Sequence, residues 1–257
     1  MLVFAVVFTA CSNDESTGTL NIEVTDAPML AEYVQEANVT ITKVEIRKAE
    51  ESGGSPFITV FEGEEDINLM ELTNGLTTQL ASLEVPVGTY DLVRIYIDQA
   101  EVVLKDQTSF DLTVPSGSSS GLKVFIDPSV EVAGGISADL LLDFDLSRSF
   151  VAKGANILNG FNFKPVLKAI NMSTVGRIEG TVSNAEEVAL ANAEVSVYAE
   201  DTLNTTTFSN DLGQFAVLGL LPGDYILKFN LSEYQERIEE ASVVVGNSTK
   251  VDTTLEQ

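Results

Sequence analysis

The sequence of 257 residues contains no histidine, no tryptophan and a single cysteine. Without histidine the chain cannot form a Ser-His-Asp triad, a Cys-His pair or a His-ligated zinc or iron site. Without tryptophan, an aromatic surface that stacks on sugars must come from the 6 tyrosines or 13 phenylalanines. One cysteine forms no disulfide within the chain, so stability must come from the hydrophobic core. These absences exclude most familiar hydrolase mechanisms.

Positive charge is also scarce, because 14 Lys and Arg stand against 39 Asp and Glu, giving a formal net charge of −25. Such a charge repels phosphate backbones and favours solubility and cation binding. We therefore expect no nucleic-acid partner. The length is sufficient for two domains of ordinary size or for one large all-β domain.

The single cysteine, Cys11, follows the apolar run LVFAVVF (residues 2–8), which is far shorter than the roughly 20 residues that span a bilayer as a helix. Thr9 and Ala10 are small, as a signal peptidase requires before its cleavage site. The sequence FTAC resembles the bacterial lipobox, which implies that residues 1–10 are a signal peptide and that Cys11 carries the lipid. No basic residue precedes the apolar run, so we expect the true start codon upstream of Met1. The alternative is a buried free cysteine.

The polar stretch after Cys11 has too little apolar content to fold, and we interpret residues 11–18 as the lipidated cysteine and its tether. Asp14 and Glu15 resemble a signal that directs lipoproteins of the phylum Bacteroidota to the outer face of the outer membrane. This resemblance implies a surface-exposed outer-membrane lipoprotein. A short solvated linker is the alternative.

The rest of the chain has the period-two pattern of β-strands, as in LNIEVT, where Leu20, Ile22 and Val24 share one face. In VTITKVEIRK the apolar positions change phase after Ile41, which predicts a β-bulge near Thr42-Lys43. Further strands are predicted at FITVF, YDLVRIYID, EVVL, SFDLTV, LKVFI, ADLLLDFDL and FNFKPVLKAI. Helix signals are few: a short helix over residues 27–37 with Asp26 as its cap, and a turn or two within residues 68–82. The pattern predicts an all-β sandwich or barrel.

Five segments carry a resemblance to a known family: GTLNIEVTDAP, VTITKVEI, LEVPVGTYDLVRIYI, SGLKVFID and DFDLSRSF, in that order. They resemble the Bacteroidota lipoproteins described as domain of unknown function 4382, over roughly residues 18–172. The resemblance implies a lipid-anchored all-β domain, which we place at residues 19–172, and brings no settled activity.

The strand pattern restarts after residues 170–176. The motifs GRIEGTVSN, ANAEVSVYAE, NDLGQF and LPGDY resemble the carboxypeptidase regulatory-like domain, which implies a prealbumin-like sandwich of seven strands at residues 176–257. In NDLGQF an Asn or Asp side chain bonds its own backbone and a glycine takes positive φ, so a hairpin turn is predicted. In LPGDY a second turn is predicted, with Tyr225 filling the core. The fold class is thus all-β, with two consecutive β-sandwich domains.

Clustered acids are the main candidates for chemistry. Asp139, Asp143 and Asp145 alternate in ADLLLDFDL and fall on one face of a strand, where calcium is the cation that carboxylates suit. The alternative is that Leu140, Leu142, Phe144 and Leu146 form the buried face and the aspartates face water. A second acidic run, FEGEEDIN, is predicted as a loop that either binds calcium or is simply solvated.

Three weaker features remain. Paired carboxylates could serve a glycan hydrolase as acid and base. Arg94 is expected to pair with Asp98, to bind a ligand carboxylate or to form a cross-strand ion pair. Thr202 and Thr253, each after an aspartate, resemble Bacteroidota O-glycosylation acceptors.

The sequence therefore predicts a non-catalytic lipoprotein of the cell envelope, with a binding or structural role in adhesion, glycan capture or support of an outer-membrane complex. Its expected partners are the membrane, through the lipid on Cys11, and a glycan or an outer-membrane protein. No cofactor is expected apart from calcium. The alternatives are a carboxylate-dependent glycan hydrolase and a calcium-stabilised scaffold.

Overall fold

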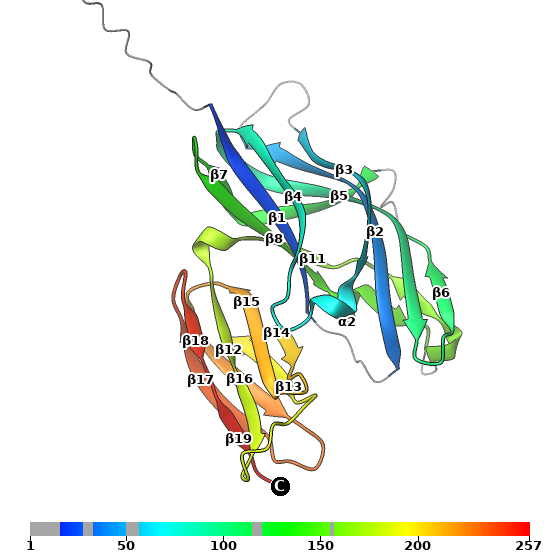
Figure 1. The fold of residues 1–257 in the computed structure, drawn as a ribbon, viewed down its shortest axis with the longest axis vertical. Helices are drawn as coiled ribbons and strands as arrows, with labels where there is room; N and C mark the ends of the chain where they lie inside the picture. Colours follow the sequence, from blue (N-terminus) through cyan, green and yellow to red (C-terminus); the bar gives the residue numbers. More distant parts are fainter. Residues whose placement is uncertain (1–15, 28–32, 50–56, 115–119, 155–156) are drawn as a thin grey trace, which may run out of the picture.

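The computed structural model describes residues 16–27, 33–49, 57–114, 120–154 and 157–257 (Figure 1). Two β-rich units follow each other along the chain, and each surrounds a hydrophobic core of its own. We refer to them as the first and the second domain. In Figure 1 the first domain runs from blue to green and the second from yellow to red.

The first domain is built on a single sheet of nine strands. The strands are β1 (Thr17–Ala27), β2 (Val34–Lys48), β3 (Phe57–Asn68), β4 (Thr78–Pro86), β5 (Gly88–Leu104), β6 (Ser109–Leu112), β7 (Leu122–Val132), β8 (Ser137–Asp145) and β11 (Leu167–Asn171). Their order is β3-β2-β5-β7-β11-β8-β1-β4, and β6 pairs with the C-terminal part of β5. The sheet curves over one buried core, so the domain is sandwich-like.

Short elements complete the first domain. They are the 3-10 turns η1 (Leu69–Leu72), η2 (Ile157–Asn159) and η3 (Met172–Thr174), the helical turn α2 (Leu146–Ser149), and the hairpin of β9 (Phe150–Ala152) and β10 (Phe161–Phe163). Of the two predicted helical segments, the one in residues 68–82 contains η1. No helix in the described part of the chain is long and apolar enough to cross a membrane.

The alternation of apolar residues explains how the strands bury one face. Leu20, Ile22 and Val24 of β1 are fully buried. In β2, the register with both β3 and β5 shifts between Ile41 and Lys43, and buried positions resume at Val44. The β-bulge that the change of phase predicts is therefore confirmed, because one extra residue returns the apolar side chains to the core.

Two sequence predictions about local structure are wrong. The helix expected over residues 27–37 is not formed where the structure describes it, because Val34–Lys48 is strand β2 and Thr17–Ala27 is strand β1. Asp26 is paired opposite Phe144 within the sheet and caps no helix there. The acidic run Glu62–Asp66 lies in edge strand β3 and forms no loop. In both cases strand pairing overrides the local signals.

The second domain consists of two four-stranded sheets packed face to face. Its strands are β12 (Gly176–Asn184), β13 (Glu194–Ala199), β14 (Thr202–Phe208), β15 (Gln214–Leu220), β16 (Gly223–Asn230), β17 (Arg237–Val243), β18 (Ser248–Lys250) and β19 (Thr253–Leu255). One sheet has the order β15-β12-β18, with β19 also beside β12, and the other has the order β14-β13-β16-β17. Strand β18 pairs with the first part of β12 and β19 with its last part, both in parallel. The two together therefore form one interrupted edge strand, and the domain counts as a seven-stranded sandwich.

The predicted turns of the second domain are present. The side chain of Asn210 accepts hydrogen bonds from the backbone N–H of Leu212 at 3.0 Å and of Gln214 at 2.9 Å, and Gly213 has φ +71°. Tyr225 is 5% exposed and its hydroxyl donates to the carbonyl oxygen of Leu221 at 2.9 Å. The turn NDLGQF and the core position of Tyr225 are therefore confirmed.

The two domains are in contact. The hydroxyl of Thr207 in β14 donates to the side-chain oxygen of Asn74 at 3.1 Å. The Nζ of Lys168 in β11 donates to the carbonyl oxygen of Asn204 at 3.2 Å. Ile170 packs closely on Gly219, where a Cβ atom would lie 2.6 Å from its Cδ1. The loop after η1 and strand β11 thus hold the second domain through β14 and β15.

Candidate functional site

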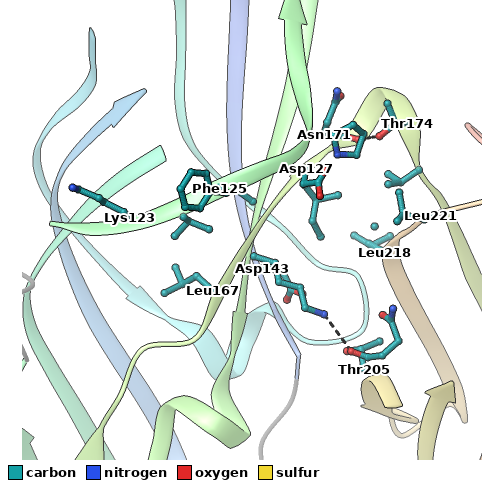
Figure 2. Close-up of a pocket in the computed structure, with 18 residues that line it drawn as sticks. Lys123, Phe125, Asp127, Asp143, Leu167, Asn171, Thr174, Thr205, Leu218 and Leu221 are labelled. Carbon is teal, nitrogen blue, oxygen red and sulfur yellow. Dashed lines mark hydrogen bonds between the residues drawn. The ribbon is translucent and has the colours of Figure 1, made fainter. Parts of the chain in front are cut away.

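A cavity of about 440 Å³ opens between the two domains (Figure 2). Strands β7 and β11 form its wall on the side of the first domain, and β14, β15 and Leu221 form the opposite wall. In Figure 2 Asp127 and Asp143 face the cavity from the first domain, with Leu218, Leu221 and Thr205 across from them. The cavity exists only because the domains meet, so neither domain could supply it alone.

The wall on β7 combines charge with an exposed aromatic ring. Lys123, Phe125 and Asp127 alternate along this strand and therefore share one face. Phe125 is 67% exposed, and the guanidinium carbon of Arg47 lies 5.9 Å from the centre of its ring. Lys123 and Asp127 are exposed beside it. This face therefore offers a ring, a cation and a carboxylate to a ligand in the cavity.

Asp143 is the carboxylate that the structure perturbs most clearly in this cavity. It lies on β8 between the buried residues Leu142 and Phe144 and points away from the core. Burial raises its pKa to about 6, the charge of Asp145 acts in the same direction, and the charges of Lys168 and Arg148 oppose it. A carboxyl group that titrates near neutral pH in a cavity is a typical mark of a functional site.

Asp26 on β1 is a second perturbed carboxylate at the domain interface. It is 6% exposed, and one side-chain oxygen accepts from the backbone N–H of Leu146 at 3.3 Å. Its other oxygen, Oδ2, is buried and has no hydrogen-bond partner among the described residues. Burial raises its pKa well above the ordinary value, and the charge of Asp143 raises it further. Both acids border a smaller cavity of about 30 Å³.

The three aspartates predicted to bind calcium together have separate roles. Asp139 is exposed and accepts from the side-chain amide of Asn21 at 2.7 Å. Asp145 accepts from the backbone N–H of Arg148 at 3.0 Å and pairs with its Nε at 2.6 Å, so it caps helical turn α2. Among the described residues no group of three or more Asp, Glu or Cys side chains is placed to hold a metal. Of these three aspartates, Asp143 alone lines the described cavities between the domains.

The faces of β8 follow the alternative interpretation in part. Leu140, Leu142, Phe144 and Leu146 are all buried in the first domain. The aspartates do not simply face water, because Asp143 and Asp145 are only partly accessible. Asp26 lies more than 100 positions away in the sequence, and no local pattern indicates that it neighbours Asp143.

Arg94 forms the cross-strand ion pair that was one of its three expected roles. Its guanidinium lies 3.2 Å from Glu45 on β2 and stacks 3.6 Å from the centre of the Phe57 ring. Glu45 also accepts from the hydroxyl of Tyr96 at 3.0 Å and pairs with Lys43 at 2.5 Å. Burial alone would raise the pKa of Glu45, but these hydrogen bonds and the charges of Lys43 and Arg94 hold it below its usual value.

The remaining predicted residues lie away from the cavity. Thr202 is exposed at the start of β14, so O-glycosylation there stays a prediction. Thr253 is only 6% exposed and its hydroxyl donates to Glu239 at 3.2 Å; O-glycosylation there also stays a prediction. Cys11 lies outside the described residues, so its lipidation stays a prediction as well.

Comparison with solved structures finds bacterial proteins of low similarity, among them pilins. The Bacillus anthracis TIE protein is 16% identical with a TM-score of 0.28, over 93% of this chain and 34% of that one, so this chain spans about a third of its length. The minor pilin GBS52 of Streptococcus agalactiae is 10% identical with a TM-score of 0.28, over 92% of this chain and 95% of the pilin. The shaft pilin SpaA of Lactobacillus rhamnosus GG is 9% identical with a TM-score of 0.28, over 94% and 98%.

Comparison with curated proteins finds no match. Comparison with protein families finds two matches. Residues 17–165 match the family described as domain of unknown function (DUF4382), and residues 177–256 match the carboxypeptidase regulatory-like domain. The first match covers more than half of the chain, and the chain therefore belongs to the DUF4382 family, with a carboxypeptidase regulatory-like domain after the family domain.

Proposed function

We propose that this protein is a non-catalytic lipoprotein of the bacterial cell envelope that displays its two β domains at the cell surface to bind a glycan. The observation that carries the binding role is the cavity of about 440 Å³ between the domains. Binding sites are commonly found where two domains meet. The lipobox-like sequence before Cys11 and the acidic residues after it support the location.

The chemistry of the cavity favours a glycan over other ligands. The exposed ring of Phe125 offers an apolar face on which a sugar ring can lie. Lys123, Asp127 and the exposed amide of Asn204 offer hydrogen-bond donors and acceptors around it. The net charge of −25 disfavours nucleic acid and other polyanions. A neutral or weakly charged oligosaccharide fits this combination.

The test is binding of the full-length mature protein to a glycan array, followed by titration calorimetry on the glycans retained. We expect Phe125→Ala and Lys123→Ala to weaken binding at least tenfold. Leu212→Ala and Lys105→Ala are matched controls, because these residues are also exposed but do not line the cavity. Equal affinity of all four variants for the retained glycans would show that the cavity is not a glycan site. Absence of binding to any glycan on the array would show the same.

The lipid anchor is tested separately by expressing the gene in a Bacteroidota host. We expect the wild-type protein to incorporate labelled palmitate, to fractionate with the outer membrane and to be accessible to protease on intact cells. Cys11→Ala should lose the label and the membrane association. An unlabelled wild-type protein would refute the anchor while leaving the binding proposal standing.

A glycan hydrolase is the second candidate, because Asp127 and Asp143 line the same cavity and the pKa of Asp143 is raised to about 6 by burial. A carboxyl group with a pKa near neutrality can act as a general acid, and a second carboxylate can act as base or nucleophile. In this case the glycans retained on the array would release reducing ends over time. Asp143→Asn would abolish release without abolishing binding, whereas absence of any release supports the non-catalytic role.

A further inference from the structure

The smaller cavity between the domains presents an unusual concentration of hydrogen-bond acceptors. Its polar lining consists of Thr25, Asp26 and Asp143 of the first domain and Thr205, Thr206 and Thr207 of strand β14. Gly75 and the β15 residues Ala216, Val217 and Leu218 complete the wall. An ionised carboxylate only accepts hydrogen bonds. The two acids are close enough for the charge of Asp143 to disfavour ionisation of Asp26.

The hydroxyl protons of two of these threonines are already used outside the cavity. Thr25 donates to the carbonyl oxygens of Leu72 at 3.2 Å and Leu76 at 2.9 Å. Thr207 donates to the side-chain oxygen of Asn74 at 3.1 Å. The oxygen atoms of both hydroxyls are therefore available to the cavity only as acceptors.

One side-chain atom of a residue that lines this cavity is left without a hydrogen-bond partner. Oδ2 of Asp26 is buried and receives no hydrogen bond from the described residues, although the side chain as a whole is 6% exposed. Leaving a buried carboxylate oxygen unpaired costs free energy, so such an atom indicates a partner that the polypeptide does not supply.

The two basic groups whose charges act on Asp143 do not provide that partner. The Nζ of Lys168 donates to the carbonyl oxygen of Asn204, and the Nε of Arg148 pairs with Asp145 at 2.6 Å. Their charges act on Asp143, but neither makes a hydrogen bond to Asp26 Oδ2. The cavity therefore combines two carboxylates and threonine oxygens, and no basic side chain among the described residues donates a hydrogen bond to Asp26 Oδ2.

We propose that this cavity binds one calcium ion through the carboxylates of Asp26 and Asp143, and that the ion joins strands β1 and β8 of the first domain to strand β14 of the second. Calcium prefers oxygen ligands and tolerates irregular geometry, including neutral oxygens from hydroxyls and carbonyls. A volume of about 30 Å³ is sufficient for one ion. Magnesium suits the site less, because it requires regular octahedral geometry and retains several waters.

The site is distinct from the glycan cavity, although Asp143 borders both. It differs from the sequence prediction, because Asp26 replaces Asp139 and Asp145 as the partner of Asp143. A bound ion would fix the relative position of the domains, and with it the shape of the larger cavity.

The test uses the full-length mature protein, stripped of metal with EGTA. Titration calorimetry with calcium chloride is expected to give one site per chain, and thermal unfolding is expected to shift upward by several degrees in 1 mM calcium but not in 1 mM magnesium. Asp26→Asn and Asp143→Asn should each lose the calcium response. Asp211→Asn is the matched control, since this aspartate is exposed on a hairpin turn and borders neither cavity.

One further measurement tests whether the ion bridges the domains. Hydrogen exchange should slow on adding calcium in β1 and β14 together, as expected for an ion that bridges them. Wild-type protein that binds no calcium would overturn the proposal, and so would a calcium response that survives in Asp143→Asn. If Asp26→Asn fails to fold, Asp143→Asn still decides the result, because Asp143 is only partly buried and its replacement retains the shape of the side chain.

Discussion

Replacing Asp143 by asparagine should make the protein more stable at neutral pH in buffer that contains EGTA. Asp143 lies between the two domains, where burial raises its pKa to about 6. Asp145 raises the pKa further, Lys168 and Arg148 lower it, and Asp26 faces the same small cavity. Asparagine has the same shape and no charge, so the substitution removes the cost of keeping a buried carboxylate ionised.

The magnitude follows from the difference between the ordinary pKa of 3.8 and the value of about 6 in the folded protein. At about 1.36 kcal/mol for each pKa unit, the cost at pH 7.5 is at most about 3 kcal/mol. The side chain remains partly accessible, and solvent screening reduces this figure. We therefore expect Asp143→Asn to raise the free energy of unfolding by about 1 to 2 kcal/mol.

The stability gained by Asp143→Asn should depend on pH. Because the pKa is raised in the folded state, the folded protein binds more protons than the unfolded chain between about pH 4 and pH 6. The contribution of Asp143 to stability is therefore complete below about pH 4 and is lost as the pH rises through 6. The gain from Asp143→Asn should accordingly be present at pH 7.5 and absent at pH 4.

Urea unfolding followed by tyrosine fluorescence and circular dichroism measures the effect at pH 4.0 and pH 7.5. Asp211→Asn removes the same charge from an exposed turn and should leave stability nearly unchanged at both pH values. A loss of stability at pH 7.5 in Asp143→Asn, or a gain of equal size at both pH values, would refute the reasoning. Either result would mean that the carboxylate is stabilised by its surroundings and not penalised by burial.

Three other substitutions test interactions within the individual domains. Tyr225→Phe removes the hydrogen bond of 2.9 Å to the carbonyl oxygen of Leu221 and should lower the stability of the second domain by about 1 kcal/mol in urea unfolding, with no change in the first domain. Gly180→Ala should destabilise the second domain by more than about 2 kcal/mol, because the new Cβ would lie 1.7 Å from the carbonyl oxygen of Val251. An unchanged free energy of unfolding would mean that β12 can shift away from Val251 at little cost. Glu45→Gln leaves Lys43 and Arg94 without their shared carboxylate and should lower the melting temperature at pH 7, and this difference should shrink as the pH falls through the lowered pKa of the wild-type glutamate and its carboxylate becomes protonated. A melting-temperature difference that does not shrink as the solution is acidified would contradict the ionic explanation.

The alternation of apolar residues was sufficient to predict most strands and one irregularity. The change of phase between Ile41 and Val44 predicted a bulge because core-facing side chains must return to the same face after an extra residue. The same rule could not show that Glu62–Asp66 is a strand, since an exposed edge strand carries polar residues on both faces. Charges on such an edge also hinder pairing with other chains.

The candidate site depends on contacts that the sequence does not encode locally. Asp143 was identified as one of three acids on a strand, but nothing near it in the sequence indicates that β14 would cover it. Asp26 resembles a helix cap in the sequence because Pro28 follows closely, and no local pattern predicts its parallel pairing with β8. The only sequence signal for the larger cavity was the alternation of Lys123, Phe125 and Asp127, which places a phenylalanine on the exposed face of a strand.

The position of strand β1 has a consequence for how the first domain folds. This strand lies between β4 and β8, and its side-chain contacts include Asn21 with Ser82, 61 positions away, and Asn21 with Asp139, 118 positions away. Closing loops of this length before any pairing is gained makes folding slow. In the second domain β13 pairs with β14 and β16 with β17, each a neighbour in sequence, and its longest pairing joins Arg177 of β12 to Ser248 of β18, a shorter loop than the one between β1 and β8. We therefore expect the second domain to fold first. Until β1 pairs with them, β4 and β8 each have an unpaired strand edge.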